Sequence, residues 1–113
     1  MVGDVIVSFD VFTATRIEQL AEYSSESPSA GDGFHYSLGT TRFSEPSRQL
    51  RADLLRSRIN QYLDLVATVS REVLDAPDSF VRLFLTLSPG DETIDAVAVK
   101  RLADANATIW IDA

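Results

Sequence analysis

Four stretches of the chain alternate hydrophobic and polar residues with a period of two, which is typical of β-strands. They cover residues 4–12, 34–43, 79–87 and 107–113. In the third stretch, every odd-numbered residue from Val81 to Leu87 is aliphatic. One side of that strand must therefore face a hydrophobic core, and the other three strands are expected to share its sheet.

Between the strands, the hydrophobic spacing changes to that of helices. Residues 15–24 place Ile17 and Leu20 at helical spacing, and Thr15 with Glu18 has the form of a capping box. These features predict a first helix over residues 15–24.

The longest helical pattern begins after the second strand and continues to Pro77. We expect Ser44 to cap it, with Pro46 in the first turn. A straight helix of about 29 residues would be about 43 Å long, so we expect a bend or break near residues 57–60. A shorter helix follows the third strand, capped by Asp95 and ended by Asn106.

The resulting order, β-α-β-α-β-α-β, predicts an α+β fold with α/β-like alternation. We expect two layers, in which one four-stranded mixed sheet carries helices packed mainly on one face. At 113 residues, the chain is expected to form a single globular domain over residues 1–113.

The pleats divide the strand residues into two sets. One set is almost wholly apolar and is expected to lie under the helices: Val5, Val7, Phe9, Val11, Phe34, Tyr36, Leu38, Val81, Leu83, Leu85, Leu87, Ile109 and Ile111. The other set mixes apolar and polar side chains: Ile6, Ser8, Asp10, Phe12, His35, Ser37, Phe80, Arg82, Phe84, Thr86, Thr108, Trp110 and Asp112.

Large aromatic rings on this second side would be costly to leave in water. Three explanations remain open. A helical segment could cover the rings, or the rings could pack on one another. A homodimer or a protein partner could bury them, because contiguous apolar patches mark interaction sites. A small ligand could also bind there.

The composition narrows the classes of partner. A net charge of −7 and a pI near 4.5 disfavour nucleic acid and anionic membranes and favour a basic protein. There is no cysteine, no apolar run of membrane-spanning length and no signal-peptide pattern at the start, so we expect a cytoplasmic protein.

Candidate chemistry is sparse. His35 is the only histidine, and Asp10 would lie beside it if the first two strands pair. An Asp that orients a His is the beginning of a general base or a ligand site, but no nucleophile motif accompanies the pair. No metal-ligand, nucleotide or other cofactor motif is present in the sequence. A cluster of arginines is expected to form an ordinary salt-bridged helix face, and the alternative is a patch that binds an anion or an acidic partner: Arg42, Arg48, Arg51, Arg56 and Arg58.

The segments Val81–Leu87 and Thr93–Asp112 resemble the closing strand, helix and final strand of a family of small bacterial proteins, the domain-of-unknown-function family 4279. The resemblance covers about a third of the chain. It implies no established activity, although several members look like accessory or immunity proteins encoded beside toxins.

These features favour a non-enzymatic, acidic protein-binding module, and the resemblance adds an immunity-type protein that neutralises a basic toxin. The residues predicted to bind the partner are Glu18, Glu22, Glu26, Asp32, Phe84, Trp110 and Asp112. The alternative is a small dimeric ligand-binding or regulatory domain with a pocket between helices and sheet. A third hypothesis is an enzyme that uses Asp10 and His35.

Overall fold

The computed structural model describes residues 4–24, 33–87 and 92–112 and shows an α+β fold with one four-stranded mixed sheet. The strands are β1 (Asp4–Thr13), β2 (Phe34–Ser44), β3 (Phe80–Leu87) and β4 (Ala107–Asp112). The helices are the 3-10 helix η1 (Glu18–Tyr23) and the α-helices α1 (Arg48–Val66), α2 (Arg71–Asp75) and α3 (Ala96–Asp104). The predicted fold class and the four strands are confirmed.

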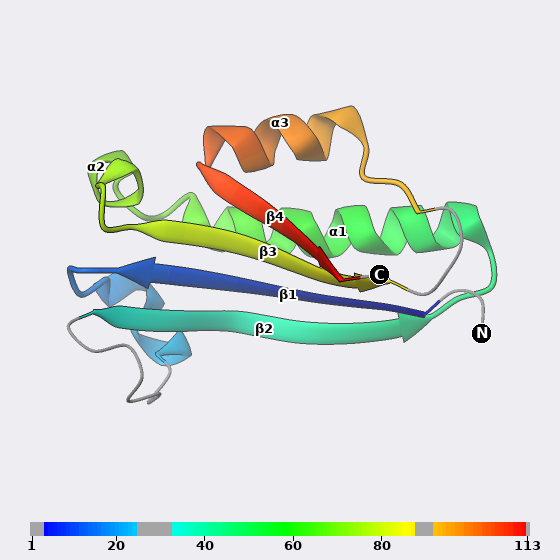
Figure 1. Cartoon of the computed structure of the whole chain (residues 1–113), viewed down its shortest axis with the longest axis horizontal. Coiled ribbons are helices and arrows are strands. Elements are labelled where there is room, and N and C mark those ends of the chain that lie inside the picture. Colours follow the sequence, from blue (N-terminus) through cyan, green and yellow to red (C-terminus); the bar gives the residue numbers. More distant parts are fainter. Residues whose placement is uncertain (1–3, 25–32, 88–91, 113) are drawn as a thin grey trace.

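The strand order in the sheet is β2-β1-β3-β4. β1 pairs antiparallel with both β2 and β3, whereas β3 and β4 pair parallel and are connected through α3. Figure 1 views the sheet with the strands in front of α1, so the face toward the viewer is the one that α1 does not cover.

The hydrophobic core lies between the sheet and the helices. Phe9 on β1 is fully buried, and its ring stacks on Tyr62 of α1 with the centroids 5.4 Å apart. Ile17 and Leu20 extend this core beneath η1, and Leu102 extends it beneath α3. Burying each such side chain contributes about 1.5–3 kcal/mol, so this side of the sheet supplies most of the hydrophobic stabilisation.

A β-bulge adjusts the pairing of β1 with β2. Phe9 lies opposite Gly39, but the next residue of β1, Asp10, lies opposite Ser37, so Leu38 is an extra residue in β2. Gly39 has φ +138°, a backbone conformation that favours glycine. The bulge keeps Leu38 in the core while His35 falls on the opposite face, beside Phe12.

The first helix differs from the prediction. It is a 3-10 helix over Glu18–Tyr23, its N-cap is Ile17, and no side chain caps it, so the predicted capping box and α-helix over residues 15–24 are wrong. Ile17 is buried and its N–H donates to the Tyr36 hydroxyl at 2.7 Å. Core packing of Ile17 fixes where the helix begins, and Thr15 lies outside it.

The second helical region begins and breaks later than predicted. Ser44 is the last residue of β2, and the cap of α1 is Ser47, whose hydroxyl accepts from the Leu50 N–H at 3.3 Å. α1 is continuous through residues 57–60, and the break falls between Val66 and Arg71, before α2. Its 19 residues span about 28 Å, which fits within the 41 Å length of the molecule.

The third helix is as predicted. The Asp95 carboxylate caps α3 by accepting from the Ala98 N–H at 2.9 Å. Asn106 follows the helix with φ 59°, the left-handed conformation that commonly ends a helix.

Two residues assigned to the covered side are exposed. Phe34 and Ile111 expose 41% and 60% of their surface, although the alternation placed both under the helices. Both lie near the ends of edge strands, where a side chain has a neighbouring strand on one side only.

Candidate functional site on the open face of the sheet

Four aromatic side chains meet on the face of the sheet that is turned away from the core. We call Phe12, Phe80, Phe84 and Trp110 the aromatic cluster. Pairing places Phe12 opposite Phe80, and Phe84 opposite Trp110, so three strands contribute to one patch. The ring centroids of Phe12 and Phe80 are 5.9 Å apart, and those of Trp110 lie 5.8 Å from Phe80 and 6.3 Å from Phe84.

The aromatic cluster is separate from the hydrophobic core. Among the described residues, the core cluster and the side chains packed against it include none of the four rings. The three phenylalanines are half-buried by their contacts with one another and with the sheet, whereas 43% of Trp110 is exposed. Part of the aromatic cluster, Trp110 above all, therefore remains exposed on this face.

Arg82 lies at the centre of the aromatic cluster. Its guanidinium carbon is 4.9 Å from the ring centroid of Trp110, 5.3 Å from that of Phe12 and 5.7 Å from that of Phe84. Cation–π contacts of this kind are worth about 0.5–2 kcal/mol, more when water is excluded. Arg82 thus fixes the rings around a positive charge.

Asp10 connects Arg82 to His35. Its carboxylate accepts from Arg82 at 3.0 Å through one oxygen and lies 2.8 Å from the His35 ring nitrogen Nε2 through the other. Asp10 is 7% exposed, and the His35 ring stacks on Phe12 with a 4.3 Å centroid distance. The predicted proximity of Asp10 and His35 is confirmed, and the carboxylate has a hydrogen-bonding partner on each side.

The arrangement orients Arg82 rather than a nucleophile. Within the described residues, the His35 ring has no hydroxyl partner, so the trio lacks the group that a general base would activate. The Nε–H of Arg82 is buried and has no hydrogen-bond partner among the described groups. An unsatisfied buried donor costs about 1–3 kcal/mol, which the surrounding network must offset.

A second ionic group lies at the opposite end of the same face. The Asp4 carboxylate accepts from the Ser44 hydroxyl and from Arg42 at 3.0 Å. The hydrogen bond from Ser44, followed by that from Arg42, holds the pKa of Asp4 below its ordinary value. The open face therefore has a charged end on β1 and β2 and an aromatic end on β1, β3 and β4.

The structure divides the residues predicted to bind a partner into two places. Phe84 and Trp110 are paired in the aromatic cluster, and Asp112 lies exposed two residues further along β4 on the same face. Glu18 and Glu22 are exposed on η1, which packs on the core side of the sheet. Glu26 and Asp32 lie outside the described residues.

Three residues of this site were not selected from the sequence, namely Phe12, Phe80 and Arg82. The alternation of β1 and β3 already placed them on the mixed side, so the signal was available. What the sequence lacked was the strand order, which brings Asp10 directly opposite Arg82.

The arginines predicted to form a salt-bridged helix face only partly do so. Arg56 pairs with Asp53 at 2.9 Å and with Asp95 at 3.3 Å on the surface. Arg51 is instead buried and pairs with Glu92 at 3.0 Å. Its position makes it part of the scaffold rather than of an exposed anion site.

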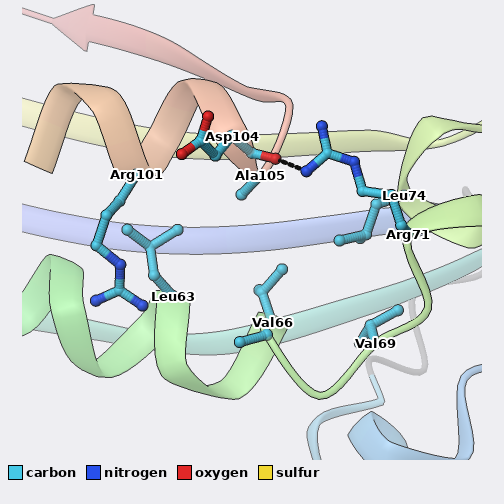
Figure 2. Close-up of a pocket in the computed structure, with 9 residues that line it drawn as sticks. Leu63, Val66, Val69, Arg71, Leu74, Arg101, Asp104 and Ala105 are labelled. Atoms are coloured by element: carbon cyan, nitrogen blue, oxygen red, sulfur yellow. Dashed lines mark hydrogen bonds between the residues drawn. The ribbon is translucent and has the colours of Figure 1, made fainter.

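A pocket of about 310 Å³ opens between α1, α2 and α3 (Figure 2). It is lined by Leu63, Val66, Ala67, Val69, Arg71, Leu74, Arg101, Asp104 and Ala105. The two arginines at its rim are engaged: Arg71 donates to Asp75 at 2.9 Å and to the Asp104 carbonyl, and Arg101 donates to Asp64 at 3.0 Å. The pocket thus combines apolar walls with two arginines that already have partners.

Residues 4–24, 33–87 and 92–112 contain no group of three or more side chains placed to hold a metal ion. Of the helices in those ranges, none has the length and hydrophobicity needed to cross a bilayer. No protein-family model, curated protein or solved structure matches this chain, so the resemblance of its C-terminal third stays a prediction.

Proposed function

We propose that this protein is a non-enzymatic protein-binding module that binds a basic protein through the open face of its sheet. The observation that carries the proposal is the aromatic cluster, which is held in place by Arg82 and leaves 43% of Trp110 exposed outside the core. Tryptophan, tyrosine and arginine dominate the binding energy of protein interfaces, and exposed apolar patches mark them.

The charge of the chain supports a basic partner. A net charge of −7 attracts a positively charged protein over distances of about a Debye length, which raises the association rate. Glu18 and Glu22 are exposed on η1 and contribute to this attraction without touching the open face. These two acids therefore raise the association rate, whereas the aromatic cluster makes the contacts of the bound complex.

The trio of Asp10, His35 and Arg82 supports binding rather than catalysis. Both carboxylate oxygens of Asp10 are engaged, and Arg82 is fixed among rings instead of being directed at a reacting group. A fixed guanidinium and a rigid aromatic surface lose little conformational entropy when a partner binds. The resemblance of the C-terminal third narrows this proposal to an immunity-type protein that neutralises a basic toxin.

The purified protein, with no tag on its open face, is used to capture partners from a lysate of the source organism. The affinity of the captured protein is then measured. The variant Phe84→Ser/Trp110→Ser removes two rings of the aromatic cluster from the open face. The matched control, Leu50→Ser/Leu54→Ser, removes two exposed leucines from α1 on the helical layer. We expect wild type and control to bind a basic protein in stoichiometric amount and the open-face variant to lose at least about tenfold in affinity.

Equal binding by the open-face variant and the wild type would remove the proposal. So would a stable homodimer that dissociates in Phe84→Ser/Trp110→Ser, because the aromatic cluster would then serve self-association.

The pocket of Figure 2 favours a second candidate, a small ligand-binding or regulatory domain. Its volume is at the lower end of those that hold small molecules. Native mass spectrometry of the purified protein would show a bound metabolite, and Ala67→Trp, which places a large ring at an exposed position of the pocket lining, should abolish that adduct. A metabolite adduct that survives Ala67→Trp would place the ligand elsewhere.

A further inference from the structure

The strand β4 forms one edge of the sheet. In the strand order β2-β1-β3-β4, it pairs with β3 alone among the described residues. In a parallel pair, every second residue of an edge strand turns its N–H and C=O away from its neighbour. β4 therefore presents backbone donors and acceptors in the spacing that another extended strand would satisfy.

The sequence of β4 contains little of the usual protection of an edge. Residues Ala107–Asp112 include no lysine or proline, and their single charge, Asp112, lies at the end of the strand. Natural edge strands are normally shielded by charged residues, by proline or by bulges. β4 keeps regular register with β3 over all six residues, so no bulge interrupts this edge.

Side chains on both faces of β4 extend the contact beyond the backbone. On the open face, Trp110 is 43% exposed and Asp112 lies two residues further along the strand. On the other face, Ile111 is 60% exposed and Ile109 is half-buried. In a strand added here, the side chains on one face would lie beside Trp110 and Asp112. The side chains on its other face would lie beside Ile109 and Ile111.

This pattern defines the chemistry of the occupant. A basic side chain fits the Trp110 and Asp112 side because cation–π and ionic contacts both favour it. An aliphatic side chain fits the isoleucine side because it buries exposed apolar surface. A second copy of this chain fits less well, since each copy carries a net charge of −7 and presents its own Asp112 at the edge.

We infer that β4 accepts an extended segment of the partner as an added strand, in which basic and aliphatic residues alternate. The inference rests on the proposed function and specifies its mode of contact: the partner pairs with the β4 backbone and covers Trp110 from the edge.

The probe is a capped synthetic peptide of six residues, the length of β4, that alternates lysine and valine. Trp110 is the only tryptophan of the chain and lies on the edge strand, so its fluorescence reports binding directly. We expect a saturable change in fluorescence. A peptide with the same side chains but N-methyl groups on alternate backbone nitrogens should bind at least about tenfold more weakly, because it loses strand hydrogen bonds.

Two protein variants complete the test. Asp112→Lys should weaken binding of the unmodified peptide by about three- to tenfold, since it replaces an attraction with a repulsion. Val97→Ser, which alters an exposed residue of α3, should bind the peptide as the wild type does.

Equal binding of the two peptides, or the absence of any saturable change, would overturn strand addition. A dimer of the free protein that dissociates in Ile111→Lys would also overturn it, because a second copy would then occupy the edge. The peptide results do not bear on the proposed function, which is overturned instead if the open-face variant binds the captured basic protein as tightly as its α1 control does.

Discussion

At the scale of single residues, the ion pair between Arg51 and Glu92 is buried, so its loss should destabilise the fold more than the loss of a surface ion pair. Arg51 is 3% exposed; its Nε lies 3.0 Å from one Glu92 oxygen and its Nη1 donates to the carbonyls of Glu45 and Pro46 at 2.7 and 2.9 Å. One guanidinium thus joins the start of α1, the segment before it and the segment before α3.

Replacing Arg51 with Ala should destabilise the fold by about 3–5 kcal/mol, because Glu92 and two carbonyls would lose a buried partner. Urea unfolding followed by circular dichroism measures the change. Arg58→Ala is the control: Arg58 donates to Gln61 on the surface of α1, and its loss should cost less than about 1 kcal/mol. Similar midpoints for the two variants would contradict the structural role of Arg51.

The carboxylate that caps α3 gives the stability a dependence on pH. The Asp95 carboxylate accepts from the Ala98 N–H, which together with Arg56 lowers its pKa below the ordinary value of 3.8. Because the folded-state pKa is depressed, the ionised cap stabilises the fold above pH 3.8, and this contribution is lost as the pH falls through the folded pKa.

Asp95→Ala should therefore lower the Tm at pH 7, and the difference from wild type should shrink as the pH falls below about 3.8. Thermal melts across this range check the prediction. Asp95→Asn is the matched variant, since an asparagine retains a capping oxygen without the charge. A Tm difference for Asp95→Ala that is the same at pH 7 and pH 2.5 would mean that ionisation of the cap adds nothing.

At the scale of elements, the bulge in β2 decides which side chains reach the open face. Gly39 has φ +138°, and a Cβ built there would lie 3.7 Å from the Tyr62 ring, an ordinary contact distance. The position therefore requires glycine because of backbone conformation and not because of space.

Gly39→Ala should destabilise the protein by about 1–3 kcal/mol through backbone strain. Thr40→Ala, on an exposed neighbour in the same strand, should change stability by less than about 0.5 kcal/mol. The two variants are compared by urea unfolding. If Gly39→Ala proved as stable as Thr40→Ala, the strand would have relaxed its register, and the chemical shifts of His35 would reveal the change.

The elements also show how far sequence can be followed into this fold. The four strands and the division of their faces were predictable because a period of two survives along Asp4–Thr13 and Phe80–Leu87. The start of α1 was not predictable, because Ser44 and Ser47 are equally good capping residues by local pattern. Only the pairing of Ser44 with β1 shows that it belongs to β2 and that Ser47 is the cap.

The same limit applies to the candidate site. Alternation placed Asp10, His35, Phe84 and Trp110 on one face, and the structure confirms that placement for Asp10 beside His35 and Phe84 beside Trp110. The central position of Arg82 depends on β3 lying next to β1, a long-range pairing that no local spacing encodes.

At the scale of the whole molecule, stability and the proposed binding surface lie on opposite faces of the sheet. The core cluster is formed between the sheet and the helices, and the aromatic cluster adds little to it. Changes on the open face should therefore leave the protein folded, which is the condition for interpreting the binding variants above. Asp10 provides a test of this separation. Among the described charged residues of the open face, it is the one that is nearly fully buried, and it binds Arg82.

Asp10→Ala should cost about 1–3 kcal/mol, because Arg82 would keep its charge among aromatic rings without a carboxylate. Arg82→Met removes a buried, unsatisfied Nε–H, but it leaves the Asp10 carboxylate with His35 as its remaining partner, so it should also cost about 1–3 kcal/mol. The double variant should then be more stable than the sum of the single losses predicts, by about 0.5–3 kcal/mol in a double-mutant cycle. Trp110 fluorescence should shift in every variant that alters Arg82 or Asp10, while circular dichroism stays that of the native fold. Strict additivity of the two losses would show that the carboxylate does not hold the guanidinium, and the aromatic cluster would then owe its arrangement to ring packing alone.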